Sequence, residues 1–203
     1  RVIFRSDGIM NISERAVEDL RALGADVTSI DAPFSMDALW ESWITLRSWS
    51  VASGAGIFYD DPEKRDLLKP AAIWEIERGL AMTAREVHQQ SVVRSMWFKK
   101  AASLFETYDA LLMPSAQVWP FPIDWVHPTE IAGVQMDTYH RWMQVVIPAG
   151  LIGLPVVNLP IGFGAAGLSA GLQLIGGRGQ DAKLLGLAND WYLGTPWKDY
   201  APA

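Results

Sequence analysis

The chain has 203 residues, of which 50% are hydrophobic and 20% are charged, a composition that can bury a sizeable core as one domain or a large part of one. Its net charge of −6, with no local run of lysines or arginines, disfavours nucleic acid and anionic membrane surfaces as partners. The lack of cysteine excludes a disulfide framework, a thiolate nucleophile and a cysteine-ligated metal, and it fits a cytoplasmic location.

The first thirty residues predict a strand, a helix and a second strand in close succession. Residues 2–4 read as a strand with no signal peptide before them, so a chain that opens at Arg1 is expected to be a fragment or a processed product. Residues 13–23 carry apolar side chains on one helical face, with Ser13 as the expected N-cap. Residues 27–30 read as the second strand. This order is typical of a βαβ unit, so we expect a sheet that is at least partly parallel.

The middle of the chain predicts helices. Residues 33–56 are rich in tryptophan and repeat apolar side chains at helical spacing. We expect a polar loop over residues 60–65 and a long helical region over residues 71–105, with a break near Gly79.

The last hundred residues predict alternating strands, loops and helices. In chain order we expect a strand over 108–114, an irregular packed loop over 114–128, a helix over 138–146, strands over 156–159 and 170–175 joined by a glycine-rich turn, and a helix over 181–193. Residues 142–177 carry no charge and are numerous enough to cross a bilayer. Because Pro148, Pro155 and Pro160 interrupt this stretch, strands and tight turns are the favoured interpretation.

Two short motifs imitate functional sites. Residues 167–171 match G-x-S-x-G, with Ser169 in the place of a nucleophile. A strand pattern follows where that motif needs a helix, and every histidine of the chain precedes the serine, whereas the corresponding hydrolase fold places its histidine later. Residues 162–167 match G-x-G-x-x-G, again without the helix that would hold a pyrophosphate. We interpret both motifs as parts of one hairpin turn.

Other candidate ligand sites are weaker. The glycine-rich residues 176–179 precede a helix and could meet an anion, but they lack G-K-[ST], so a structural turn is favoured. The three histidines have no metal-ligand spacing, and we expect neither a metal nor a cofactor. The ten tryptophans are expected mainly in the core, with two or three at a pocket or an interface.

Three pieces of the last hundred residues resemble a known family when they are taken in order. They are residues 108–115, similar to "yDxLLxPt"; residues 148–155 with Pro160 and Gly162, similar to "N-x-x-G-x-P…P-x-G"; and residues 167–176 with Asp181 and Leu184-Leu185, similar to "GLPxGLQxxG…D…LL". Their order and spacing resemble the C-terminal part of the amidase-signature family. Gly150 and Ser169 depart from the asparagine and proline usual there, and the second departure creates G-x-S-x-G by accident.

This resemblance implies an α/β fold, in which residues 1–203 form the C-terminal portion of a single amidase domain with a mixed β-sheet flanked by helices. It also implies hydrolysis of a carboxylic amide to a carboxylate and an amine or ammonia. In the family, a serine nucleophile, a second serine on a cis peptide bond and a lysine perform this acyl transfer. These groups lie in a Gly/Ser-rich segment of the N-terminal half, which this sequence lacks. We therefore expect no catalytic residue here, no activity of the chain alone, and a missing N-terminal catalytic portion as its complement.

The resemblance also suggests a pocket wall. In members that act on glutamine, an acidic residue lies seven positions before the usual asparagine, and that place is Met143 here. An apolar wall should disfavour a charged amine, because removing the charge from water costs free energy. We predict that Trp142, Met143, Val146 and Trp74 contact the substrate, and that the substrate is an amide with an apolar or aromatic group rather than glutamine.

Two alternatives remain beside this interpretation. The chain could be a noncatalytic α/β module that binds a small molecule or a partner protein through its tryptophans. It could also be a complete serine hydrolase built on Ser169. A homodimer is compatible with the main interpretation and with both alternatives.

Overall fold

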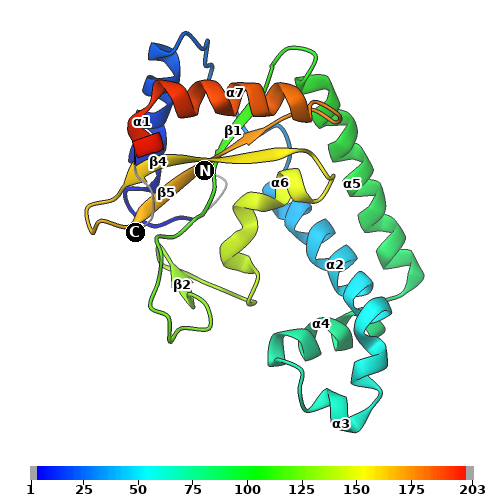
Figure 1. Cartoon of the computed structure of the whole chain (residues 1–203). Coiled ribbons are helices and arrows are strands. Elements are labelled where there is room, and N and C mark those ends of the chain that lie inside the picture. The colour runs from blue at the N-terminus through cyan, green and yellow to red at the C-terminus, as the bar shows by residue number, and fades with distance from the viewer. Residues whose placement is uncertain (1–3, 200–203) are drawn as a thin grey trace. The chain divides into compact units, whose positions relative to one another are not determined.

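The structure, a computed structural model, describes residues 4–199, and these divide into two compact units. The first unit combines both ends of the chain, up to residue 33 and from residue 100 onward, and the second covers residues 34–99. Figure 1 labels most of the helices and strands of both units. The strand predicted at residues 2–4 falls largely outside the described residues, and Phe4 itself belongs to no strand.

The first unit is built on a three-stranded antiparallel sheet with the order β1-β5-β4. Its strands are β1 (Leu111–Pro114), β4 (Val156–Phe163) and β5 (Ser169–Ile175). The central strand places Gln173 opposite Met113 of β1 and Asn158 of β4. Because side chains alternate between the two faces of a strand, these three residues share one face, and Leu172 and Leu174 belong to the other.

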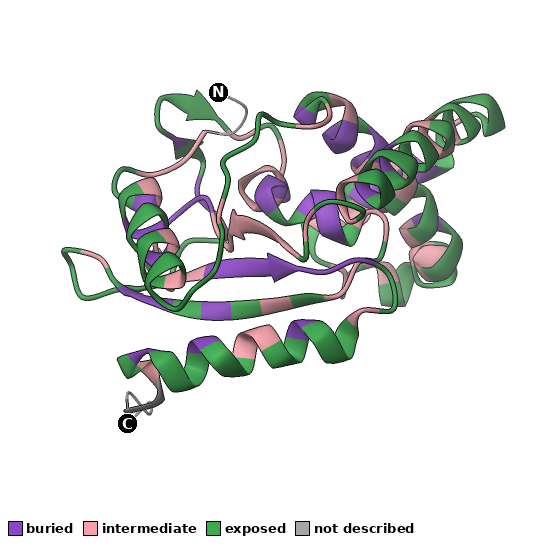
Figure 2. Ribbon diagram, turned by 90° about the horizontal axis from the view of Figure 1, so that it is seen from above, coloured by how far each residue is buried: buried purple, intermediate pink, exposed green. Residues whose placement is uncertain are grey.

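Two helices, α1 (Ile9–Ala22) and α7 (Asp181–Gly194), cover the face that carries Leu172 and Leu174. The buried side chains between them form the core of this unit and are Ile12, Ala16, Leu159, Ile161, Leu172, Leu174, Leu184 and Trp191. Figure 2 shows the central strand as the most buried part of the sheet. Removal of this apolar surface from water is the main stabilisation of the unit.

Short elements lie toward the opposite face. A small hairpin of β2 (Glu130–Ile131) and β3 (Val134–Gln135) precedes the 3-10 helix η1 (Arg141–Val146) and the helical turn α6 (Ile147–Gly150). The helix predicted over residues 138–146 is therefore confirmed in place, but it has the tighter 3-10 geometry. Pro148 lies in the first turn of α6, where backbone N–H groups have no partner within the helix, so the missing N–H of proline removes no hydrogen bond. A second 3-10 helix, η2 (Pro196–Asp199), follows α7.

The glycine-rich hairpin between β4 and β5 confirms the interpretation of the two misleading motifs. Ser169 is the first residue of β5, so no helix follows it as a nucleophile elbow requires. The turn closes with hydrogen bonds from the Gly164 N–H to the Leu168 carbonyl at 2.8 Å and from the Gly167 N–H to the Gly164 carbonyl at 2.9 Å. A bulge interrupts β4 between Pro160 and Gly162.

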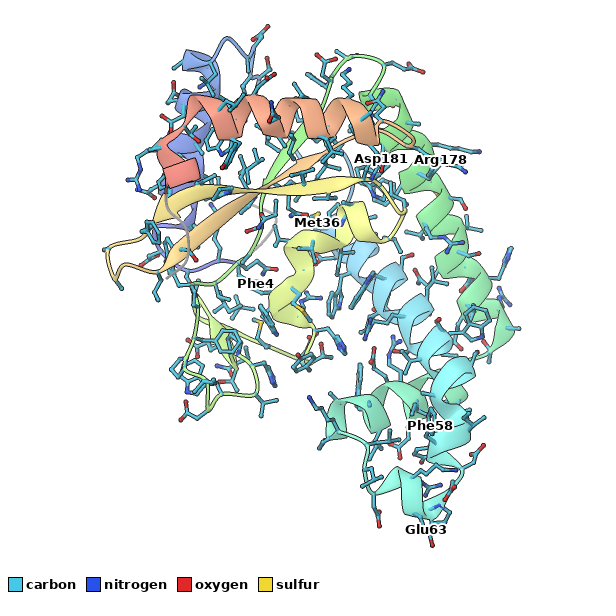
Figure 3. All side chains as sticks on the ribbon, in the orientation of Figure 1. Phe4, Met36, Phe58, Glu63, Arg178 and Asp181 are labelled. Carbon is cyan, nitrogen blue, oxygen red and sulfur yellow. The ribbon has the colours of Figure 1, made fainter. Side chains whose placement is uncertain are left out.

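The uncharged stretch over residues 142–177 forms most of η1, α6, β4 and β5, as its prolines and glycines predict. Among residues 4–199, no helix is both long enough and apolar enough to cross a membrane. The glycines at 176–179 form a turn closed by the Gln180 N–H on the Gly177 carbonyl, and Arg178 and Asp181 mark where this turn meets α7 in Figure 3.

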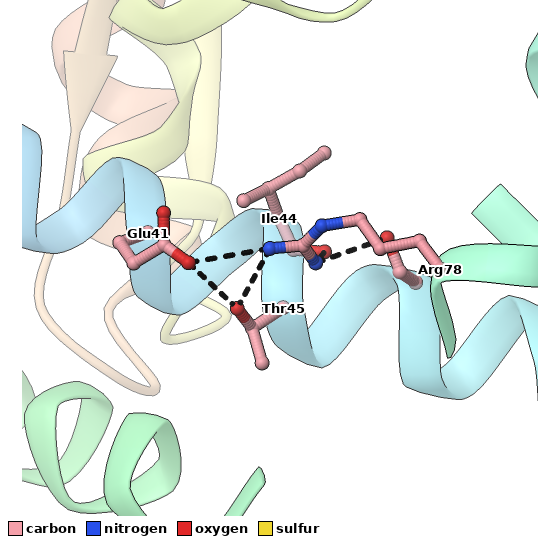
Figure 4. A network of polar contacts seen from close by, with 5 residues as sticks. Glu41, Ile44, Thr45 and Arg78 are labelled. Atoms are coloured by element: carbon pink, nitrogen blue, oxygen red, sulfur yellow. Dashed lines mark hydrogen bonds and ion pairs between the residues drawn. The ribbon is translucent and has the colours of Figure 1, made fainter. Parts of the chain in front are cut away.

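The second unit is helical. It contains α2 (Met36–Tyr59), α3 (Pro62–Arg65), α4 (Pro70–Leu80) and the start of α5 (Ala84–Leu104). Arg78 of α4 joins α2 by donating to the Ile44 carbonyl at 3.1 Å, to Glu41 at 3.2 Å and to Thr45 at 3.3 Å (Figure 4). A second pair, Arg47 with the buried Glu75 at 2.6 Å, repeats the connection.

Three sequence predictions are wrong in detail. Residues 27–30 form no strand, because most of their side chains are exposed and no strand among residues 4–199 pairs with them, so the βαβ unit is absent there. Helix α1 begins at Ile9 after Gly8, and Ser13 is not its cap but donates its hydroxyl to the Ile9 carbonyl at 2.8 Å. The polar loop at 60–65 contains the helical turn α3, capped by Asp61.

Candidate functional site

A cavity of about 260 Å³ lies in the first unit. Its walls come from α1, from the loop that follows β1, from η1 and from the first residues of β5. Three aromatic rings contribute to it, those of Trp119, Phe121 and Trp142, and much of the remaining surface is small, including Ala116 and Gly171. Among the described residues that line the cavity, none is charged.

The aromatic rings of the cavity form an ordered array. Phe121 meets Trp142 edge to face with 5.4 Å between ring centroids, and its other neighbour Trp125 stacks at 6.4 Å. Such geometries are favourable because the positive edge of one ring meets the negative face of another. The array extends from the cavity to Trp125, whose side chain is half exposed.

Trp119 is held by its surroundings. Its indole N–H donates to the Asp7 carbonyl at 2.9 Å. Its ring lies so close to Gly164 that a Cβ atom there would be 2.7 Å from the ring, which is closer than nonbonded carbons approach. The hairpin turn and the loop after β1 can therefore meet only because residue 164 has no side chain.

Trp142 brings one polar atom to this apolar region. Its indole Nε1 is buried and has no hydrogen-bond partner among the described residues. Buried donors are normally paired, and an unpaired one costs free energy that a suitable acceptor would recover.

The four predicted substrate-contacting residues are divided between the two units, with three in the first unit and Trp74 in the second. Trp142 lines the cavity. Met143 and Val146 share the short helix η1 with it, but Met143 is half-buried, Val146 is 40% exposed, and neither is among the described lining residues. Trp74 belongs to α4 in the second unit, where the guanidinium of Arg78 lies 6.0 Å from its ring centroid.

Other residues of the site were not predicted. Trp119 and Phe121 were assigned only to a packed, irregular loop, since nothing in their local pattern distinguishes a cavity wall from core. Three buried glutamines lie within or next to the lining segments, and they are Gln117, Gln144 and Gln173. Gln173 belongs to the "GLQ" piece of the family motif, and that position is a sequence signal that points to it.

The cavity offers a place to bind rather than groups to react. The serine hydroxyls on its lining include Ser13, which is committed to the Ile9 carbonyl, and the exposed Ser169. None of the described lining residues is a histidine, lysine or carboxylate that could act as a base. Among residues 4–199, no cluster of three histidine, aspartate or glutamate side chains could hold a metal ion.

The helix-flanked sheet and its motifs belong to a known class of protein. The chain is a member of the Amidase family, whose model matches residues 5–185. Its relatives include a glutamyl-tRNA(Gln) amidotransferase subunit of an Exiguobacterium species, 24% identical over 90% of this chain and 41% of that protein. The corresponding subunit of Hahella chejuensis is 47% identical over 57% of this chain and 22% of that protein.

Solved structures confirm the fold. A bacterial aryl acylamidase of the amidase-signature enzymes superimposes with a TM-score of 0.82 at 23% identity, over 98% of this chain and 42% of that one. A 6-aminohexanoate cyclic dimer hydrolase superimposes with a TM-score of 0.74 at 19% identity, over 98% of this chain and 43% of that one. The chain thus spans about two fifths of the length of these structures, and 41% of the Exiguobacterium subunit.

Proposed function

We propose that this chain is the C-terminal portion of an amidase that hydrolyses a carboxylic amide bearing an apolar or aromatic group to a carboxylate and an amine or ammonia. The chain contributes the sheet and one wall of the substrate pocket, and the catalytic serines and lysine belong to a complementary N-terminal portion. The observation that carries this proposal is the cavity beside Trp142, which is aromatic and has no charge among its described lining residues.

The composition of the wall selects for the proposed substrate. A planar apolar group gains by leaving water and by packing against the rings of Trp142 and Phe121. A zwitterionic amide such as glutamine would leave its charges unpaired there, which is costly. We include Met143 and Val146, on the same short helix, and Trp74 as further substrate contacts.

The reaction needs groups beyond the cavity wall. The amide C–N bond breaks, an oxygen atom of water is added to the carbonyl carbon, and the amine leaves with a proton. The name aryl acylamidase, borne by a structure with this fold, is consistent with an aryl amide as the substrate class. The amidotransferase subunits among the relatives leave glutamine as the alternative to be tested.

The test compares hydrolysis of acetanilide and of glutamine by the complete protein, with a fluorophosphonate probe to locate the nucleophile. We expect faster turnover of acetanilide and no label on any serine of this chain. Trp142→Ala should raise KM for acetanilide, whereas Trp49→Ala, at a half-exposed position in α2, should leave it unchanged. Much faster turnover of glutamine would refute the proposed substrate class, and a label on Ser169 would revive a self-contained hydrolase.

A second candidate function is a noncatalytic binding module, favoured by the lack of a base among the described lining residues. It predicts acetanilide binding without hydrolysis by any complete form of the protein. We retain a cytoplasmic location and a homodimer as further proposals, and sedimentation equilibrium tests the second.

A further inference from the structure

Two buried glutamines connect the walls of the apolar cavity. Gln117 is 1% exposed and Gln173 is 4% exposed, so neither amide is solvated by bulk water. Gln117 lies within the loop that lines the cavity, and Gln173 follows Gly171 of the cavity wall by two residues on β5. A buried amide must find partners inside the protein, and the partners of these two amides are backbone groups of other walls.

Both glutamines meet at Val145 in η1. The Val145 N–H donates to the Gln117 side-chain oxygen at 2.9 Å, and the Val145 carbonyl accepts from the Gln173 side-chain nitrogen at 3.3 Å. One residue of η1 is therefore held from both sides. Trp142, the ring that η1 contributes to the cavity, lies three residues away, about one turn of a 3-10 helix.

The same two side chains reach the other walls. Gln173 also donates to the Pro114 carbonyl at the end of β1, at 2.8 Å. Gln117 donates to the Phe4 carbonyl at 2.9 Å, and its own carbonyl accepts from the Ser6 N–H at 2.8 Å. Phe4, labelled in Figure 3, thus ties the segment that leads into α1 to the loop after β1.

A short 3-10 helix needs such anchors. Its hydrogen bonds are less well aligned than those of an α-helix, and a run of six residues has little stability of its own. Hydrogen bonds are directional, so an amide fixes both the distance and the rotation of the backbone it bonds. An apolar side chain of equal size would fill the same volume without fixing either.

We propose that Gln117 and Gln173 are positioning residues. They hold η1 so that the ring of Trp142 lies at the distance from the other cavity walls at which it can pack against an aromatic ligand. This inference rests on the proposed function, because it assigns the cavity to the aryl group of the amide. It goes further by assigning the geometry of the site to two residues that contact no ligand.

The test uses the purified chain of 203 residues, to which the proposed function assigns no catalytic residue, so that para-fluoroacetanilide binds without being hydrolysed and its binding is followed by fluorine NMR. Gln117→Met and Gln173→Met keep nearly the same volume but remove the amide. Each should weaken binding about tenfold, since each deprives buried backbone groups of their hydrogen bonds and releases η1. In protein labelled with fluorotryptophan, the Trp142 resonance, assigned with Trp142→Phe, should broaden or split in both variants.

Two controls separate positioning from general stability. Gln135→Met makes the same exchange at an exposed position of β3 and should leave binding unchanged. Leu184→Val reduces packing in the core on the opposite face of the sheet, and should lower the urea midpoint while leaving both affinity and the Trp142 resonance unchanged.

The outcomes distinguish the two proposals. If wild-type protein binds the anilide and both methionine variants bind equally well, the positioning role is wrong and the pocket remains. If Leu184→Val weakens binding as much as the glutamine variants do, the effect is one of stability and the positioning role is again wrong. If wild-type protein fails to bind, the cavity is not the aryl site, which removes the pocket wall of the proposed function and this inference with it.

Discussion

The close contact between α2 and α4 makes Gly79 the position where one methyl group should have the largest effect. A Cβ atom at residue 79 would lie 2.2 Å from the Ser48 carbonyl oxygen and 2.6 Å from the Ala52 Cβ. Nonbonded carbons approach to roughly 3.5 Å, so the carbon pair would be about 0.9 Å too close. Neither obstacle is the flexible end of a long side chain, so the helices themselves would have to separate.

The net effect of Gly79→Ala can be worked out from two opposing terms. Alanine favours a helix interior over glycine by about 1 kcal/mol. Overpacking of a tight contact costs typically 1–3 kcal/mol, and a clash with backbone belongs at the upper end, about 3 kcal/mol. We therefore expect the free energy of unfolding to fall by about 2 kcal/mol, and the Arg78 bonds across the same interface to lengthen.

Gly54→Ala is the matched control, because Gly54 lies inside α2 and a Cβ there would meet nothing within 4 Å. Only the helix preference of alanine over glycine applies there, so the Gly54→Ala protein should be more stable than the wild type by about 0.5–1 kcal/mol. Urea denaturation followed by circular dichroism measures both, and hydrogen exchange locates the change in α2 and α4. A Gly79→Ala protein as stable as Gly54→Ala would refute this close packing.

Three further predictions concern other parts of the chain. The Thr83 backbone N–H and hydroxyl donate to the Glu86 carboxylate and hold its pKa below the ordinary 4.5. The charged carboxylate therefore stabilises the start of α5 above pH 4.5. This stabilisation is lost as the pH falls through the lower pKa of the folded state. NMR titration of the Thr83 amide should show the transition below pH 4.5, and Glu86→Gln should abolish it. Ser169→Ala changes a residue on the cavity lining and can alter KM, but it should leave kcat for amide hydrolysis by the complete protein unchanged, because Ser169 begins β5 and is not a nucleophile. Loss of kcat to the background rate would contradict this assignment. Trp191→Phe removes the hydrogen bond from the buried Trp191 indole N–H to the Pro160 carbonyl, and it should lower the free energy of unfolding by about 1–2 kcal/mol. Urea denaturation measures this change, and an unchanged urea midpoint would argue against that hydrogen bond.

The elements whose patterns are local can be predicted from the sequence. The hairpin of β4 and β5, the final helix and the two long helices follow from glycine, proline and apolar periodicity, which act within a few residues. The strand predicted at 27–30 has a suitable composition, but a strand exists only where another strand pairs with it, and local sequence cannot supply that partner.

The sequence singles out only one of the three aromatic residues that line the cavity, for a similar reason. Trp142 is predicted only as the neighbour of Met143, which lies where glutamine-using members of the family have an acidic residue, and the structure places Trp142 on the cavity wall. Trp119 and Phe121 come from an irregular loop, so their convergence on Trp142 depends on long-range folding that periodicity does not reveal. The role of Gln117 was equally hidden, because its partners at Val145 and Phe4 are distant along the chain.

The contact between Trp119 and Gly164 has a consequence for sequence variation among relatives. The ring occupies the space that a side chain at residue 164 would need, so the two positions share one volume. A larger residue at 164 should therefore be accepted only in relatives whose residue 119 is smaller, and the two positions should covary although 44 residues separate them along the chain. Neighbouring Ala165 and Ala166 are exposed and carry no such constraint, so the tip of the same turn is free to diverge.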